Sequence, residues 1–579
     1  MPKSSILEIK NVTYTYPTRS HPTIEDVNLN LRPGECVLLL GPTGSGKSTL
    51  AMCLNGLIPH SLGGQLEGRV LVDGVDTRQS SVTELATQVG LLFQDPEAQI
   101  CNLYALDELA FGCENLGLPP DEIQKRVNWV ADALEISSFL TTPVQHLSLG
   151  LKQRIALGSI LAMEPRVLVL DEPTSNLDAG AVRTLVRIID TLRNKQGSSV
   201  LVMEHDADSF LGVADRVVVL NKGKLVTQGS PKQVFLGQTQ NLLDMGVKVP
   251  ELCYLLDGIR QLGVSEVYNS DICVSSVSQF IASQCRSVWR QGIQHTESNH
   301  PQTKRVPNLA VSELDIQMPD GHMLLNDINF SLFPRETVAV IGRNGVGKTV
   351  LFKTIAGLRT PTRGNIEING TNILQMKSLE RAKRIGFVFQ EPDHQFIRDR
   401  VCDDIELVWR SICSSPVETI RKANETLAHI SLTDYRESYI YQLSMGQRRL
   451  LSIATALAPG KTLLILDEPT IGLDSRATFA IIDMLNNIQG EALSKIVITH
   501  DMKIVSSLSQ RVIALANSQI AYNGPLFGLY EQPQVMNTIG ISPSNAWEVY
   551  KTLRSSWGMN INPAATVQEL ISQLERRGI

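Results

Sequence analysis

The chain has 579 residues and a net charge of −6, with 53 Lys and Arg against 59 Asp and Glu. At roughly 150 residues per domain this length predicts several domains, and the acidic balance argues against a broad basic surface for nucleic acid. The sequence has no apolar run of the ~18 to 20 residues that cross a bilayer and no signal-peptide core in MPKSSILEIK, so we expect a cytosolic protein with at most a peripheral membrane role. Its nine cysteines include no C-x-x-C pair, so we expect mostly buried free thiols.

The first 40 residues read as short strands that lead into a glycine-rich loop. Alternating apolar residues predict strands over 6–9, 12–16 and 27–31, with Pro17 and Pro33 between and after them. The continuous apolar run 36–40 predicts a buried strand, and a helix is expected over 49–57.

The loop between that strand and that helix, GPTGSGKST at 41–49, fits the pattern G-x-x-x-x-G-K-[ST]. A strand, a glycine-rich loop and a helix N-terminus aim successive backbone N–H groups at one point, which suits the phosphates of a nucleotide. Lys47 would supply a positive charge there, and the Ser48 hydroxyl would be a ligand for Mg²⁺. The alternative is a chance glycine-rich turn, which the flanking strand and helix argue against.

Further elements follow in alternating order. Strands are predicted over 68–73, 89–93, 167–170 and 199–203, and helices over 121–134 and from LSLGLKQR, which opens the helix, as far as Pro165. The run 167–170 is apolar throughout, as in a central parallel strand.

The second half of the chain repeats this order. A second loop, GRNGVGKT, with Gly342, Gly347, Lys348 and Thr349, follows the apolar run 337–341. The landmarks Gln390, Ser444, Asp467 and Asp474 each lie 296 residues after a matching residue of the first half. We therefore expect two duplicated nucleotide-binding domains, 1–235 and 306–525, with a small helical segment and polar linker at 236–305 and a helical tail at 526–579.

Acidic pairs end the apolar strand in each half. Asp171 with Glu172, and Asp467 with Glu468, would face the crevice where ligands bind at the carboxyl ends of parallel strands. We assign Asp171 and Asp467 to Mg²⁺, and the two glutamates to polarising an attacking water. The alternative is a pair of solvated acidic turns.

Together with these features, further motifs resemble those of ABC ATPases over nearly the whole chain. LSLGL at 147–151 and LSMGQ at 443–447 resemble the family's LSGGQ signature, and 174–178 and 470–474 match its D-loop. His205 and His500 match the switch histidine, and Gln94 and Gln390 match the Q-loop. The resemblance implies an α/β fold with two P-loop ABC-type domains, each combining a mostly parallel sheet core, an antiparallel β subdomain and a helical signature subdomain.

The resemblance also implies ATP and Mg²⁺ as cofactors and a head-to-tail internal pair, in which each ATP lies between one domain's loop and the other's signature. The implied catalytic residues are Glu172, Glu468, His205, His500, Gln94 and Gln390. The implied Mg²⁺ ligands are Ser48, Gln94, Asp171, Thr349, Gln390 and Asp467. The implied ATP-binding residues are Tyr16, Gly41, Pro42, Thr43, Gly44, Ser45, Gly46, Lys47, Ser48, Thr49, Gly342, Arg343, Asn344, Gly345, Val346, Gly347, Lys348, Thr349, Val350, Ser148, Gly150, Ser444, Gly446 and Gln447.

The two implied sites differ in composition. Leu151 replaces the signature glutamine that would complete the second site, and Met318 aligns with Tyr16, where the family stacks an aromatic ring on adenine. We hypothesise that the second site turns over more slowly. Equal competence of both sites is the alternative, because each keeps its glutamate and histidine.

The segments QDPEAQ at 94–99 and QEPDHQ at 390–395 resemble the Q-x-P-[ED]-x-Q segment of energy-coupling-factor (ECF) importer ATPases. The resemblance implies uptake of a vitamin or metal ion through a transmembrane coupling protein and a substrate-binding subunit, at the cytoplasmic face of the membrane. The implied contact residues are Gln94, Pro96, Glu97, Gln99, Gln390, Pro392, Asp393 and Gln395. The proline and acid could also simply cap a helix start.

Two other classes remain as alternatives. A soluble tandem ABC protein acting on ribosomes or DNA would carry a cysteine cluster, a basic linker or a coiled-coil insertion, and the intervals Lys47 to Ser148 and Lys348 to Ser444 leave no room for the last. A regulatory module without transport would have lost a loop lysine or a glutamate, and neither is lost. The transported substrate cannot be read from the sequence.

Overall fold

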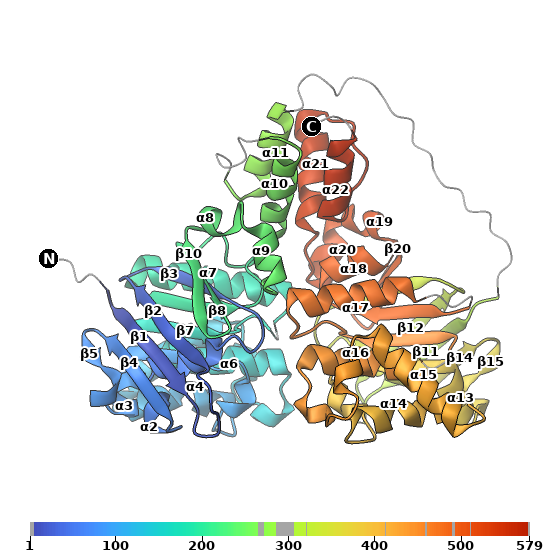
Figure 1. The fold of residues 1–579 in the computed structure, drawn as a ribbon, viewed down its shortest axis with the longest axis horizontal. Coiled ribbons are helices and arrows are strands. Elements are labelled where there is room, and N and C mark those ends of the chain that lie inside the picture. Colours follow the sequence, from blue (N-terminus) through green and yellow to red (C-terminus); the bar gives the residue numbers. More distant parts are fainter. Residues whose placement is uncertain are drawn as a thin grey trace. The chain divides into compact units, whose positions relative to one another are not determined.

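The computed structural model describes residues 5–175, 177–264, 271–284, 306–319, 321–410, 413–457, 460–488, 492–509 and 511–576. The expected polar linker at 294–302, Cys285 and Asn176 of the first D-loop lie outside these residues. The chain forms two compact units, residues 1–286 with 571–579, and residues 287–570. Figure 1 shows the order of their elements along the chain.

Two sheets frame the first unit. A six-stranded sheet has the order β10-β9-β3-β8-β7-β6 and is parallel except for the antiparallel pair β9–β10, and a four-stranded antiparallel sheet has the order β2-β1-β4-β5. The strands are β1 (Leu7–Thr15), β2 (Ile24–Leu31), β3 (Cys36–Leu40), β4 (Gln65–Val72), β5 (Val75–Asp76), β6 (Val89–Leu92), β7 (Val167–Asp171), β8 (Ser199–Glu204), β9 (Arg216–Asn221) and β10 (Lys224–Gly229). Strands β3, β7 and β8 are buried along their whole length, which explains their continuous apolar runs.

The helices of this unit lie between and after the strands, singly or in succession. They are α1 (Lys47–Leu54), α2 (Leu57–His60), α3 (Val82–Gln88), α4 (Ala105–Asn115), α5 (Pro120–Ala133), α6 (Leu149–Ala162), α7 (Ala179–Gln196), α8 (Pro231–Phe235), α9 (Thr239–Asp244), α10 (Glu251–Gln261) and α11 (Val274–Gln284). The helix expected over 49–57 begins two residues earlier, at Lys47, and ends at Leu54. Helix α6 stops at Ala162, before Pro165, as predicted.

The second unit repeats both sheets, with the orders β16-β17-β18-β13-β19-β20 and β12-β11-β14-β15. Its strands are β11 (Leu309–Gln317), β12 (Met323–Leu332), β13 (Thr337–Gly342), β14 (Arg363–Ile368), β15 (Thr371–Asn372), β16 (Ile385–Val388), β17 (Leu463–Asp467), β18 (Ser494–Ile498), β19 (Arg511–Ala516) and β20 (Gln519–Pro525). The helices from residue 306 onward are α12 (Lys348–Ile355), α13 (Ser378–Arg384), α14 (Val401–Arg410), α15 (Pro416–His429), α16 (Met445–Ala456), α17 (Ser475–Asn487), α18 (Met502–Leu508), α19 (Leu526–Tyr530), α20 (Pro533–Ile539), α21 (Asn545–Trp557) and α22 (Val567–Glu575). The predicted α/β fold with duplicated sheets is confirmed.

Strand β1 joins two strands that the sequence predicts separately, over 6–9 and 12–16. The pairing of β1 with β4 shifts register between Lys10 and Thr13, and Asn11 has a φ of 50°. Opposite this bulge lies Gly68, with a φ of 78°, where an added Cβ would lie 2.2 Å from the Asn11 carbonyl oxygen. Only glycine leaves room for the bulged backbone. Gly364 takes the same place opposite Glu313 in the second unit.

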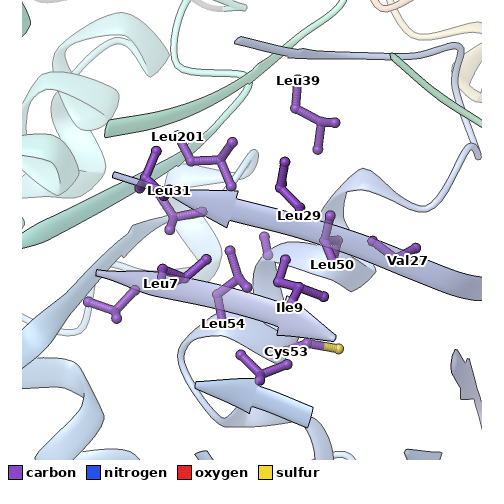
Figure 2. Packing of buried hydrophobic residues seen from close by; sticks show 14 of the residues in the cluster. Leu7, Ile9, Val27, Leu29, Leu31, Leu39, Leu50, Cys53, Leu54 and Leu201 are labelled. Carbon is purple, nitrogen blue, oxygen red and sulfur yellow. The ribbon is translucent and has the colours of Figure 1, made fainter. Parts of the chain in front are cut away.

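Apolar side chains of both sheets and of α1 form the core beneath the glycine loop. Leu7, Ile9, Leu29 and Leu31 of the antiparallel sheet pack with Leu39 of β3 and with Leu50, Cys53 and Leu54 of α1 (Figure 2). All eight are at most 5% exposed. Burial of a leucine side chain contributes about 1.5–3 kcal/mol, so this cluster fixes α1 against β3 and thereby holds the loop between them.

Cysteine burial agrees with the expectation of free thiols. Eight cysteines lie in the described part of the chain, all unpaired, and five of them are buried: Cys36, Cys53, Cys113, Cys253 and Cys402. Burial raises the pKa of the Cys36 and Cys53 thiols to about 12. These thiols are therefore protonated and act as small apolar core residues.

Candidate nucleotide-hydrolysis site

The glycine loop of each half ends where a helix begins without a side-chain cap. Gly46, with a φ of 106°, immediately precedes α1, and Gly347, with a φ of 100°, immediately precedes α12. The first-turn N–H groups of these helices point toward the loop, which is the arrangement that binds phosphate. Lys47 is 5% exposed and donates to the Gly41 carbonyl oxygen at 2.8 Å. Lys348 donates in the same way to Gly342 at 2.7 Å.

The aspartate that ends β7 or β17 lies beside the hydroxyl of its loop. In the second half Thr349 donates to Asp467 at 2.8 Å, and in the first the Ser48 side chain lies near enough to Asp171 to lower the pKa of its carboxyl. Burial raises the pKa of both carboxyls, although these hydroxyls and the loop lysines oppose the shift. A buried carboxylate beside a hydroxyl is a set of hard oxygen donors, as Mg²⁺ requires.

The Oδ1 atom of Asp171 is buried and accepts no hydrogen bond from any described residue. A buried acceptor of this kind needs a partner. The residues present therefore fit the expected Mg²⁺ at this position, where Ser48 and Asp171 would hold it.

Glu172 is the centre of a polar cluster in the first half. It is 6% exposed, and its φ of 50° places this non-glycine residue in the left-handed region. Gln94 donates to Glu172 Oε2 at 2.9 Å, and Nε2 of His205 lies 2.6 Å from Oε1. Burial alone would raise the pKa of Glu172, but His205, Lys47 and Gln94 outweigh it and lower the pKa, so Glu172 is ionised. The structure brings together the three residues predicted to act on water in this half.

The second half arranges the same residue types differently. Here Nδ1 of His500, rather than Nε2, lies 2.9 Å from Oε1 of Glu468, whose φ is 46°. Burial lowers the pKa of His500, but the adjacent Glu468 outweighs it, so the pKa is raised. Gln390 is exposed at the end of β16.

The signature motifs begin α6 and α16 with different caps. Ser444 accepts a hydrogen bond from the Gln447 N–H at 3.3 Å, and the Gln447 side chain accepts one from the Ser444 N–H at 2.9 Å, which forms a capping box. Ser148 makes only the first of these bonds, to the Leu151 N–H at 3.4 Å, because leucine has no acceptor to return the second. Both serines are exposed.

The Q-x-P-[ED]-x-Q segments are short 3₁₀ turns over Pro96–Ala98 and Pro392–His394. Glu97 pairs with Lys152 of α6, and Asp393 pairs with Arg448 of α16 at 2.6 Å. The second glutamine of each segment also bonds within its own half: Gln99 donates to the Leu91 carbonyl at 3.3 Å and accepts from the Phe93 N–H, and Gln395 donates to the Ser452 carbonyl at 2.6 Å. Asp95 caps the first turn by accepting from the Glu97 N–H at 2.9 Å, whereas the second turn has no side-chain cap, and Glu97 and Asp393 remain more than half exposed.

The two positions expected to contact adenine, Tyr16 and Met318, have different neighbours. The Tyr16 hydroxyl lies 3.1 Å from that of Thr49, and its ring meets the Tyr14 ring edge-on at 4.9 Å. In the second half the guanidinium of Arg359 lies 3.6 Å from the Met318 sulfur. The sequence reasoning missed this arginine.

The sequence reasoning also missed Glu204, the residue before His205. It is 4% exposed, and its carboxyl accepts hydrogen bonds from the Thr174 hydroxyl at 2.7 Å and the Thr174 N–H at 3.1 Å. Burial raises its pKa to about 8. The matching residue of the second half is Thr499. This difference between the two repeats is the sequence signal that could have identified Glu204.

Comparison with known proteins agrees with this geometry. A family model described as ABC transporter matches residues 24–175 and again residues 325–471. The chain belongs to the ABC transporter family. As a member, it binds ATP, hydrolyses it and is an ATP-binding subunit of a transporter. In the described part of this ABC ATPase no helix is both long and apolar enough to span a membrane.

Individual relatives cover nearly the whole length. A Methanosarcina mazei protein, provisionally named an ABC transporter ATP-binding protein, is 32% identical over 99% of this chain and 98% of its own. YkoD of Bacillus subtilis, provisionally named an HMP/thiamine import ATP-binding protein, is 35% identical over 91% of this chain and 93% of its own. A solved structure of cbiO1 from Clostridium perfringens, titled as part of the ABC transporter complex cbiONQ, is 31% identical, covers 44% of this ABC ATPase and all of its own chain, and has a TM-score of 0.37.

Proposed function

We propose that this ABC ATPase, bound at the cytoplasmic face of the membrane, drives an ECF-type importer that takes up a micronutrient, either a vitamin or a metal ion. The observation that carries the proposal is the Q-x-P-[ED]-x-Q segment, which occurs once in each half and has an exposed acid in both. The name of YkoD, which refers to HMP/thiamine import, supports a vitamin or vitamin precursor as the substrate class.

Hydrolysis in the first half would depend on Glu172. Its ionised carboxylate accepts a proton from the attacking water or orients it, while Gln94 and His205 fix the position of the carboxylate. Lys47 and the N–H groups at the start of α1 hold the phosphates. Mg²⁺, bound by Ser48 and Asp171 with Gln94 as a further candidate ligand, would neutralise charge on the phosphates.

Each ATP would be completed by the signature motif of the opposite half. Ser148 and Ser444 are exposed at helix N-termini, where a hydroxyl and free N–H groups can meet a γ-phosphate. ATP would then hold the two halves together, and hydrolysis would release them. Fusion of both halves in one chain raises their effective concentration for this pairing.

Exposed apolar side chains beside the two segments support a docking surface for a membrane subunit. Leu103 is 57% exposed a few residues after Gln99, and Ile397 is 74% exposed just after Gln395. Tyr439 and Tyr441, 39% and 72% exposed, stack in the second half with ring centroids 5.4 Å apart. Grouped exposed apolar residues mark interaction sites.

The test is copurification of the tagged full chain with a polytopic membrane protein. We expect the chain to be recovered from detergent-solubilised membranes with such a subunit, and the double variant Leu103→Asp with Ile397→Asp to lose it. Leu374→Asp, at a residue that is 51% exposed in the 3₁₀ turn over Ile373–Gln375, is the control and should keep the subunit. A chain that ignores membranes and sediments with ribosomes would overturn the proposal.

A further inference from the structure

One buried position of the signature helix differs between the two halves. Gln153 of α6 and Arg449 of α16 lie 296 residues apart, at the same place in the repeat, and each is 1% exposed. Their side chains bond to different segments. Gln153 donates to the carbonyl oxygens of Glu172 at 3.2 Å and Pro173 at 2.9 Å, just after the acidic pair of its half.

Arg449 reaches the Q-loop instead. Its guanidinium donates to the Phe389 carbonyl oxygen at 2.5 Å and to that of Gln390. Its Nε is buried without a partner among the described residues. Burial lowers the pKa of Arg449 to about 10, so the group stays charged at neutral pH. The carboxylates of Asp467, Glu468 and Asp393 and the two carbonyl hydrogen bonds offset part of the cost of burying this charge.

Further contacts also join the Q-loop of the second half to helix α16. Arg448 pairs with Asp393 at 2.6 Å, and Gln395 donates to the Ser452 carbonyl at 2.6 Å and the Thr455 hydroxyl at 2.8 Å. Among the described residues of the first half, only the ion pair is matched, by Lys152 and Glu97. Gln99 bonds back to its own strand end, and Gln153 bonds to Glu172 and Pro173.

We propose that Arg449 is a positioning residue that fastens the second-half Q-loop to its own signature helix, so that residues 389–395 and α16 move as one body. In the first half, Gln153 leaves residues 93–99 and α6 able to move relative to one another. One consequence rests on the proposed transport function. A membrane subunit that displaces residues 390–395 would also displace Ser444, whereas displacement of residues 94–99 would move Ser148 only slightly.

The test is amide hydrogen exchange of the full chain, followed in the peptides 389–396 and 93–100. The His394 and Gln395 N–H groups donate to the carbonyls of Glu391 and Pro392, so loosening of this turn is detectable. Arg449→Gln should accelerate exchange in 389–396 about threefold to tenfold and leave 93–100 unchanged. Arg449→Lys, which can reach one carbonyl, should restore part of the protection. Arg421→Gln, at an exposed arginine of α15 paired with Glu425, is the matched control.

The reciprocal change, Gln153→Arg, should slow exchange in 93–100. Unchanged exchange in 389–396 for Arg449→Gln would overturn the proposal, and so would acceleration spread evenly over the whole chain with a fall in melting temperature, which would indicate a general packing role. The exchange result is independent of transport. A chain that binds ribosomes rather than a membrane subunit would refute the transport role but would not affect the proposed contact of Arg449 with the Q-loop.

Discussion

In the second half, Nδ1 of His500 lies 2.9 Å from Oε1 of Glu468. The raised pKa of His500 means that the folded state binds its proton more tightly than the unfolded chain does. The resulting stabilisation is fully present below about pH 6.5, the usual histidine value, and is lost as the pH rises through the raised pKa. Melting temperatures of the wild type and His500→Gln between pH 5.5 and 9 should therefore differ most at the acidic end. A difference that grows with pH would contradict this assignment.

The raised pKa of Glu204 should make the stability of the first half depend on pH. Its pKa of about 8 in the fold exceeds the ordinary glutamate value of about 4.3. The protonated form is the stable one when folded, so stability falls as the pH rises from the ordinary value through 8. Glu204→Gln keeps an oxygen that can accept from Thr174, and at pH 8.5 it should raise the free energy of unfolding by on the order of 2 to 4 kcal/mol. Denaturant titrations at pH 5 and 8.5 check this, with Glu67→Gln at an exposed position as the control, and an equal effect at both pH values would count against it.

Restoring the capping box at Leu151 should increase the stability of the chain. Leu151→Gln supplies the acceptor that Gln447 provides in the second half, and it should stabilise the chain by about 0.5–1 kcal/mol. If the signature of the first half completes the second ATP site, this change should also raise turnover there. Gln447→Leu is the mirror variant and should act in the opposite direction. If neither variant changes the ATPase turnover, the capping box contributes to stability and not to catalysis.

The two loop lysines test whether the ATP sites are unequal. Lys47→Ala removes the phosphate charge from the site that we propose to contain Tyr16 and the LSMGQ signature, so it should abolish most of the ATPase rate, by roughly tenfold or more. Lys348→Ala should lower the rate by about twofold or less. Steady-state ATPase assays of both full-length variants decide the question. Equal losses would favour two competent sites.

Leu50 tests the core that holds the first loop. It is completely buried between α1 and the two sheets, so Leu50→Ala should cost about 2–5 kcal/mol of unfolding free energy. Leu358→Ala, at a residue that is 60% exposed, should change stability by less than about 0.5 kcal/mol. Denaturant titration of both variants provides the comparison, and similar costs would mean that α1 is not anchored by this cluster.

Much of this arrangement could be predicted because the signals are local. The apolar run before Gly41 and the loop pattern itself define β3 and α1 to within three residues, and the duplication checks both sheets a second time. The bulge at Asn11 could not be predicted, because it depends on Gly68, more than fifty residues away. The clustering of Gln94, Glu172 and His205 was expected only through family resemblance, since nothing in their spacing fixes side-chain direction. The contacts of Arg449 and Glu204 depend on packing between distant segments, which sequence patterns do not encode.

The ion pairs Glu97–Lys152 and Asp393–Arg448 each join residues that lie 55 apart in sequence. The longer acid faces the shorter base in one copy, and the shorter acid faces the longer base in the other. A recombination breakpoint between the partners would join aspartate to lysine or glutamate to arginine, which changes the combined length of the two side chains. A crossover that leaves 97–152 or 393–448 intact keeps the matched pair, whereas a crossover inside either block replaces one partner.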